Sequence, residues 1–116
     1  MNPDLGPLIT KEHMERVLSY IQSGIDEGAT LVSGGERYTK GECAEGYFIR
    51  PTIFADCTRD MKIVREEIFG PVLSVTTVKN DEEAIRVANN SDYGLAAGLW
   101  TANVSKVHRL ARQIRA

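Results

Sequence analysis

The protein has 116 residues, which is enough for one domain and excludes an enzyme built from two domains. Hydrophobic residues make up 42% and charged residues 26% of the chain, which is typical of a globular protein and excludes a disordered or fibrous one. The net charge is −2, so the basic stripe that nucleic-acid binding requires is not expected, and no nucleic-acid partner is predicted. The densest basic cluster, Arg109, Arg112 and Arg115, is interpreted as an ordinary solvated helix face.

No hydrophobic run approaches the roughly 18 residues that span a bilayer, so no membrane partner is expected. Residues 1–4 lack the basic and apolar regions of a secretory signal, which makes a cytoplasmic location the default expectation. Cys43 and Cys57 form neither a CxxC motif nor the framework of a disulfide-rich secreted protein. Because His13 and His108 are far apart in sequence, no metal site is expected.

The first predicted element is a helix over residues 10–27. Its hydrophobic residues recur at spacings of three and four, which places them on one face: Met14, Val17, Leu18, Ile21 and Ile25. Thr10 is suited to be the N-cap, and Gly28 is suited to end the helix in the left-handed conformation. A short strand is expected at residues 30–33. The Gly34-Gly35 pair after it predicts a turn and not a phosphate-binding loop, because no glycine-rich nucleotide motif follows.

The middle of the chain is less regular. Residues 36–46 are polar and contain glycine, so a surface loop is predicted. Residues 48–54 are expected to be extended, and Pro51, which has no N–H to donate, favours an edge strand or an irregular one. Residues 72–78 are rich in β-branched side chains and have the length of a buried strand.

The last third of the chain predicts two helices around a strand. Asn80, followed by Glu83, resembles a capping box and opens a short helix that Asn89 ends. An apolar strand is expected over residues 95–101, and a final helix over residues 104–114. Strands and helices that alternate through short loops indicate βαβ units. The predicted fold class is therefore α/β, with an open, largely parallel sheet and flanking helices.

Short motifs are spaced along nearly the whole chain. They are Gly6-Pro7-Leu8-Ile9, residues 28–35 with their terminal Gly34-Gly35, Pro51-Thr52-Ile53-Phe54, Glu66-Glu67-Ile68-Phe69-Gly70-Pro71, and Ala88-Asn89-Asn90 with Tyr93-Gly94-Leu95. Together, and in this order, these motifs resemble those of the aldehyde dehydrogenase superfamily. Residues 56–57 and 61–67 are most similar to the betaine aldehyde dehydrogenases.

The resemblance implies that residues 1–116 are part of the catalytic α/β domain of such an enzyme, with the nucleophile, the dinucleotide-binding domain and the oligomerisation arm outside the chain. For the whole protein it implies NAD or NADP as cofactor, a small aldehyde as substrate and a homo-oligomeric assembly. In the family reaction a cysteine thiolate attacks the aldehyde, hydride passes to the nicotinamide, and water activated by a carboxylate hydrolyses the thioester. No catalytic residue is expected in this chain, which alone should be inactive.

The resemblance assigns two residues to cofactor binding, Glu67 and Phe69. In the family, the glutamate directly before Ile-Phe-Gly-Pro holds the nicotinamide ribose, and a carboxylate can accept hydrogen bonds from two vicinal hydroxyls. The phenylalanine corresponds to the aromatic residue beside the nicotinamide ring. From the residues alone, Glu67 is also compatible with a solvated member of an acidic pair, and Phe69 with a core residue. Gly70 and Pro71 are expected to shape the backbone that carries them.

Other reactive residues are interpreted as structural. Cys43 lies in an acidic loop, where carboxylates disfavour the thiolate, so it is expected to be a non-catalytic surface thiol. Cys57 is expected to be half-buried. Trp100 is expected in the core and His108 at the surface.

A pair of nearby carboxylates could suggest acid–base chemistry. Asp56 and Asp60 are instead expected to be turn residues, since Arg59 lies between them and could neutralise either.

Two hypotheses about function follow. The first is an NAD(P)-dependent aldehyde dehydrogenase that acts on betaine aldehyde or a related amino-aldehyde. A variant of it is another enzyme of the same superfamily that oxidises a different aldehyde. The second is a stand-alone, non-catalytic α/β interaction module derived from the same fold. The few predicted strands favour part of a longer protein over a small complete domain with frayed ends.

Overall fold

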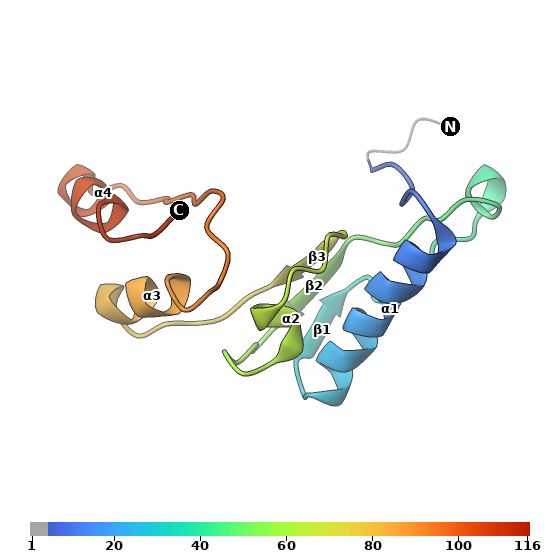
Figure 1. Ribbon diagram of the computed structural model, residues 1–116, viewed down its shortest axis with the longest axis horizontal. Coiled ribbons are helices and arrows are strands. Elements are labelled where there is room, and N and C mark those ends of the chain that lie inside the picture. The colour runs from blue at the N-terminus through green and yellow to red at the C-terminus, as the bar shows by residue number, and fades with distance from the viewer. Residues whose placement is uncertain (1–4) are drawn as a thin grey trace. The chain divides into compact units, whose positions relative to one another are not determined.

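The computed structural model describes residues 5–116 (Figure 1). Residues 1–4, for which no secretory signal is expected, lie outside the described residues. The chain divides into two compact units, Met1–Thr77 and Val78–Ala116, and each is considered by itself. Within the described residues, no helix combines the length and the hydrophobicity that a membrane span requires.

The first unit opens with helix α1 (Lys11–Asp26), and the predicted ends of this helix are confirmed. The Thr10 hydroxyl oxygen accepts a hydrogen bond of 3.1 Å from the backbone N–H of His13, which satisfies a donor that the helix itself leaves unpaired. Gly28 follows the helix with a φ of 92°, a conformation that suits a residue without a Cβ. The buried face of α1 consists of Met14, Val17, Tyr20, Ile21 and Gly24.

Within residues 5–116, three strands form one sheet in the order β1 (Thr30–Ser33), β2 (Thr52–Ala55) and β3 (Val72–Ser74). The β1 and β2 strands are antiparallel, whereas β2 and β3 are parallel. The short helix α2 (Lys62–Arg65) connects the parallel pair, so a βαβ unit is present. The predicted α/β class, with helices beside an open sheet, is confirmed, and the sheet is mixed because one of its two pairings is antiparallel.

Strand β2 is central in this sheet, so of the two expectations an edge strand is wrong, while an irregular strand agrees with its pairing to β1. The strand begins at Thr52, one residue after Pro51, and the proline therefore takes no part in the ladder. The backbone N–H of Thr52 donates to the carbonyl of Pro71 at 2.8 Å. The pairing of β2 with β1 is irregular, with a register shift between Leu31 and Ser33.

The core of the first unit lies where α1 and α2 pack on β2. Thr52 and Phe54 are 2% and 0% exposed, so the buried side chains alternate along β2 as the pleat requires. A Cβ added at Gly24 would lie 3.1 Å from the Phe54 ring and 2.9 Å from the end of Ile63. The missing side chain at Gly24 therefore lets α1 approach both residues closely.

The loop over residues 36–46 contains a single 3₁₀ turn, η1 (Gly41–Cys43). Cys43 is 4% exposed, so the expectation of a surface thiol is wrong. The physical reason is that the loop folds back on itself, because the Arg37 guanidinium donates to the carbonyls of Ala44 and Gly46 at 2.9 and 3.0 Å. Cys57 is also 4% exposed, which is more buried than expected.

The second unit contains helices α3 (Asp81–Ala88) and α4 (Val104–Ala111). The predicted Asn80 cap is confirmed, because the Asn80 side chain accepts from the backbone N–H of Glu83 at 2.8 Å. The Glu83 carboxylate accepts from the N–H of Lys79 at 2.7 Å, one residue before the cap.

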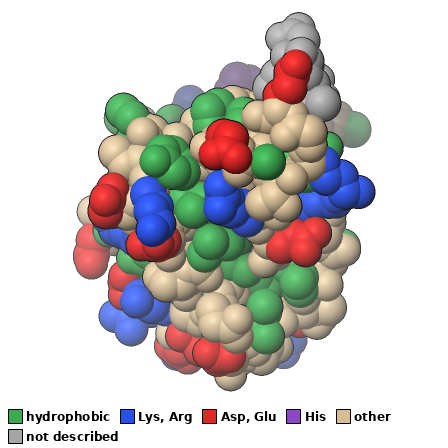
Figure 2. All heavy atoms as spheres, turned by 90° about the vertical axis from the view of Figure 1, so that its right-hand side faces the viewer, with side chains coloured by type: hydrophobic (Ala, Val, Ile, Leu, Met, Phe, Trp, Pro, Cys, Tyr) green, Lys and Arg blue, Asp and Glu red, His purple; other side chains and the backbone are tan. Residues whose placement is uncertain are grey.

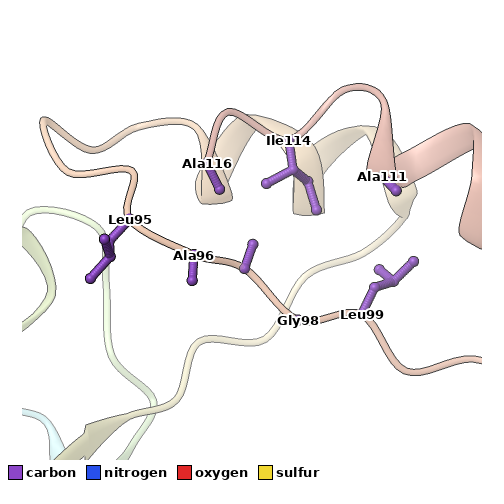
Figure 3. Close-up of a pocket in the computed structure, with 8 residues that line it drawn as sticks. Leu95, Ala96, Gly98, Leu99, Ala111, Ile114 and Ala116 are labelled. Carbon is purple, nitrogen blue, oxygen red and sulfur yellow. The ribbon is translucent and has the colours of Figure 1, made fainter.

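The predicted strand over residues 95–101 is wrong, since this segment is irregular. A strand needs a neighbour for its backbone N–H and C=O groups, and no strand pairs with this segment within residues 5–116. Trp100, expected in the core, is 90% exposed, and Leu95 is 98% exposed. The segment instead lines an open apolar groove of about 350 Å³ (Figure 3). The other side of this groove is formed by Ala111, Ile114 and Ala116.

Large hydrophobic side chains are exposed in both units. On the face that Figure 2 shows, hydrophobic side chains lie between acidic and basic ones. Those of the sheet include Leu31, Val32, Leu73 and Val75, which are 39%, 60%, 57% and 40% exposed. Strand β1 is exposed at all four of its positions, whereas the central strand β2 buries Thr52 and Phe54.

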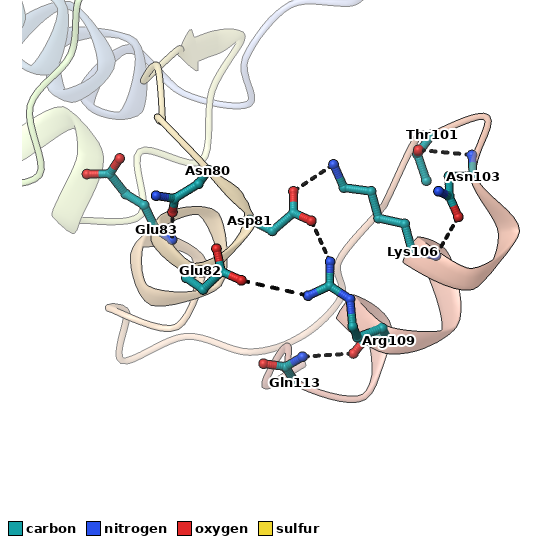
Figure 4. Close-up of polar contacts among 9 residues, drawn as sticks. All are labelled: Asn80, Asp81, Glu82, Glu83, Thr101, Asn103, Lys106, Arg109 and Gln113. Atoms are coloured by element: carbon teal, nitrogen blue, oxygen red, sulfur yellow. Dashed lines mark hydrogen bonds and ion pairs between the residues drawn. The ribbon is translucent and has the colours of Figure 1, made fainter.

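Polar contacts join the two helices of the second unit (Figure 4). Asp81 at the start of α3 accepts from Lys106 and from Arg109 of α4, each at 2.6 Å. The hydrogen bond from Lys106, followed by that from Arg109, lowers the pKa of Asp81 below its ordinary value of 3.8. Within the basic cluster of the last helix, Arg109 is thus paired and not merely solvated, while Arg115 donates to the carbonyl of Asn89 at 2.6 Å.

Replacing Asp81 by asparagine is expected to lower the free energy of unfolding at about pH 7. A depressed pKa in the folded state means that the ionised carboxylate stabilises the fold above pH 3.8 and that this contribution disappears as the pH falls through the folded-state value. Denaturant unfolding of wild type and D81N across this range should therefore converge in acid. Asp92→Asn is the matched control, because Asp92 is exposed and forms no ion pair with the described residues. A constant difference between wild type and D81N at all pH values would contradict the ion-pair account.

Candidate functional site

The segment that joins α2 to β3, residues 66–71, carries both predicted cofactor-binding residues and is called the site loop. Three contacts fix the site loop against α1. The Tyr20 hydroxyl donates to the Glu66 carboxylate at 2.7 Å, Ile68 is 8% exposed in the core, and the His13 ring bonds to the carbonyl of Phe69 at 2.7 Å. The site loop is therefore a fixed part of the first unit.

Gly70 allows the site loop to lie directly on α1. A Cβ at this position would be 2.7 Å from one methyl group of Val17 and 2.9 Å from the other, closer than packed carbons can approach. The carbonyl of the next residue, Pro71, accepts a hydrogen bond from the backbone N–H of Thr52 in the central strand. The expectation that Gly70 and Pro71 shape this backbone agrees with both contacts.

Phe69 has a strained backbone and an exposed ring. Its φ is 57°, in the left-handed region that costs a residue with a side chain on the order of 1 kcal/mol. The ring is 75% exposed, so Phe69 is not a core residue of the described chain. Its only ring neighbour among the described residues is His13, edge-on at 6.4 Å between centroids with an interplanar angle of 64°. A strained residue with an exposed aromatic ring is typical of a binding site.

Glu67 is exposed, and its carboxylate makes no hydrogen bond or ion pair with residues 5–116. The carboxylate of the neighbouring Glu66, in contrast, accepts a hydrogen bond from the Tyr20 hydroxyl. A carboxylate with both oxygens unused can accept two hydrogen bonds from vicinal sugar hydroxyls, and an exposed ring two residues later can stack on a flat heterocycle. These two residues therefore fit the ribose and nicotinamide of a dinucleotide.

An open cavity of about 360 Å³ adjoins the site loop. It is lined by Leu5, Gly6, Pro7 and Leu8 on one side and by Gly70 and Pro71 on the other. The backbone N–H of Leu8 donates to the carbonyl of Tyr47 at 2.9 Å, which holds the first of these segments in place. The fold thus brings two of the motifs found in the sequence, far apart in the chain, to the same cavity.

The remaining candidates occupy structural positions. Asp60 lies in a turn and 3.8 Å from Arg59, as expected, whereas Asp56, with a φ of 55°, accepts from the Thr30 hydroxyl at 2.8 Å and does not pair with Arg59. His108 is exposed, as expected. Within residues 5–116, no cluster of three or more histidine, cysteine or acidic side chains could hold a metal ion.

The family model for the aldehyde dehydrogenase family matches residues 1–116. The chain belongs to this family. The resemblance found in the sequence motifs is thereby confirmed over the whole chain.

Solved structures of aldehyde dehydrogenases are similar to this chain. The NAD⁺ complex of an aldehyde dehydrogenase from Bacillus cereus is 51% identical, with a TM-score of 0.90, over 97% of this chain and 22% of that one. An aldehyde dehydrogenase from Mycobacterium tuberculosis complexed with NAD⁺ is 48% identical, with a TM-score of 0.91, over 96% and 23%. Betaine aldehyde dehydrogenase from Staphylococcus aureus in complex with NAD⁺ is 38% identical, with a TM-score of 0.93, over 97% and 23%.

The chain thus spans less than a quarter of the length of these aldehyde dehydrogenases. The agreement of fold includes the mixed sheet and its flanking helices.

His13 is a further residue of the site, because its ring bonds to the backbone of the site loop. The sequence offers it only as an isolated candidate metal ligand. The sequence contains one signal that His13 faces the core. It lies four residues before Val17, residues four apart in a helix share a face, and Val17 belongs to the predicted core face.

Proposed function

We propose that this chain is a segment of the catalytic domain of an NAD(P)-dependent aldehyde dehydrogenase and that it supplies part of the cofactor site. The single observation that carries the proposal is the pairing of an unused carboxylate, Glu67, with an exposed ring, Phe69, on a loop fixed to α1. NAD is favoured over NADP, because the similar structures from Bacillus cereus and Mycobacterium tuberculosis are NAD⁺ complexes.

Each of the two residues has a distinct role in this proposal. The Glu67 carboxylate accepts hydrogen bonds from the ribose next to the nicotinamide, which orients the sugar, and Phe69 packs beside the nicotinamide ring. A bound cofactor would supply the acceptor for the hydride that leaves the substrate. Neither Glu67 nor Phe69 transfers a proton or forms a covalent bond to the substrate.

The nucleophile is expected outside this chain. Both of its cysteines, Cys43 and Cys57, are 4% exposed, and a thiol that attacks an aldehyde must be accessible and ionised. The whole protein would oxidise an aldehyde to a carboxylate through a cysteine thioester. We propose betaine aldehyde or a related amino-aldehyde as substrate, supported by the local similarity of residues 56–57 and 61–67 and by the Staphylococcus aureus structure.

The proposal is tested with the full-length protein that contains this segment. We expect aldehyde-dependent formation of NADH when the protein is given NAD⁺ and a panel of aldehydes that includes betaine aldehyde. The 116-residue chain alone, assayed in parallel, should form none. If the full-length protein reduces neither NAD⁺ nor NADP⁺ with any aldehyde of the panel, the proposed activity is wrong. NADH formation by the isolated chain would refute the assignment of the nucleophile to another part of the protein.

A further inference from the structure

His13 lies where the first turn of α1 meets the site loop. The hydrogen bond from its own backbone N–H to the Thr10 side chain fixes that turn. His13 is half-buried and lies on the face of α1 that carries Val17, the residue against which Gly70 packs. Its side chain is therefore directed at the site loop by the helix itself.

The contact between this histidine and the site loop is a short hydrogen bond to the main chain. The distance from the His13 Nε2 atom to the carbonyl oxygen of Phe69 is 2.7 Å. Since a carbonyl oxygen can only accept, Nε2 carries the proton and donates it. The acceptor belongs to the residue with a φ of 57°, so the bond acts on the strained position of the loop.

We propose that His13 is a positioning residue for the dinucleotide. By holding the Phe69 carbonyl, it keeps the left-handed backbone from relaxing, and this backbone sets where the Phe69 ring and the nearby Glu67 carboxylate stand. The inference rests on the proposed function of Glu67 and Phe69. It adds a residue that touches neither the ribose nor the nicotinamide.

The experiment compares glutamine and asparagine at position 13 in the full-length protein. The amide nitrogen of glutamine occupies nearly the place of histidine Nε2, whereas asparagine is one methylene shorter and cannot reach the Phe69 carbonyl. Calorimetric titration with NAD⁺, without aldehyde, gives the dissociation constant. We expect H13N and H13A to weaken NAD⁺ binding about three- to tenfold, the effect of one lost hydrogen bond, and H13Q to stay near wild type.

Glu67→Gln is measured beside these variants so that two failures can be told apart. If E67Q weakens NAD⁺ binding but H13N and H13A do not, the role of His13 is overturned and the proposed function stands. If none of the variants affects NAD⁺ binding, the role of His13 and the proposed function are both overturned. Equal weakening by H13Q and H13N would show that the bond to Phe69 is not what matters. Thermal unfolding of each variant identifies any that lose the fold, and the glutamine–asparagine pair then remains decisive because the two share the same amide group.

Discussion

Replacing Phe54 by alanine is expected to lower the free energy of unfolding by about 3–5 kcal/mol. Phe54 is 0% exposed at the centre of the sheet, where it packs with Ile63 against Gly24 of α1. Truncation removes the transfer free energy of a large ring. It also leaves a cavity that three rigid elements cannot close. The loss is measured by denaturant unfolding followed by circular dichroism.

The control for this prediction is Leu73→Ala on the neighbouring strand. Leu73 is 57% exposed, on a face of the sheet that neither α1 nor α2 covers in this chain, so its truncation should change stability by less than about 0.5 kcal/mol. Equal losses for F54A and L73A would mean that the core does not lie between α1 and the sheet as described.

Replacing Glu67 by glutamine is expected to weaken NAD⁺ binding by the full-length protein about 10- to 100-fold. Hydrogen bonds to a charged group contribute about 1.5–3 kcal/mol, and each 1.4 kcal/mol corresponds to about a tenfold change in the dissociation constant. The change is nearly isosteric and lies on an exposed side chain, so the fold should be unaffected.

Glu66→Gln is the matched control for this substitution. Glu66 is adjacent and carries the same charge, but its carboxylate accepts from Tyr20, and a glutamine oxygen can accept the same bond. If E66Q weakened NAD⁺ binding as much as E67Q, the effect would come from the local charge and not from a specific contact.

Local signals in the sequence predicted the elements that local chemistry determines. The Thr10 and Asn80 caps, the glycine after α1 and the hydrophobic spacing of α1 are set by residues within a few positions of each other. These features occur in the structure because a cap or a periodic face needs no distant partner. The α/β class followed from the alternation of such elements.

Features that depend on distant partners could not be predicted in the same way. The segment 95–101 has the composition of a strand but finds no strand partner within the described residues. The central place of β2 depends on β1 and β3 on either side of it, and the burial of Cys43 depends on Arg37 closing its loop. For such features, tertiary contacts override local preference.

The candidate site was predicted in part. The motif around Glu67 and Phe69 located both residues, but their exposure and the positive φ of Phe69 came from the structure. The bond from His13, 56 residues away in the chain, has no signature in a single sequence. Only the packing of α1 on the site loop brings these residues together.

The central claim is that the Glu67 carboxylate binds the ribose hydroxyls next to the nicotinamide. It is tested most directly by a thermodynamic cycle in the full-length protein, with wild type and E67Q each titrated with NAD⁺ and with an analogue that lacks those two hydroxyls. E67Q is predicted to bind NAD⁺ far more weakly than wild type does, and to bind the analogue as wild type does. Equal weakening of both ligands, or of neither, would contradict the claim.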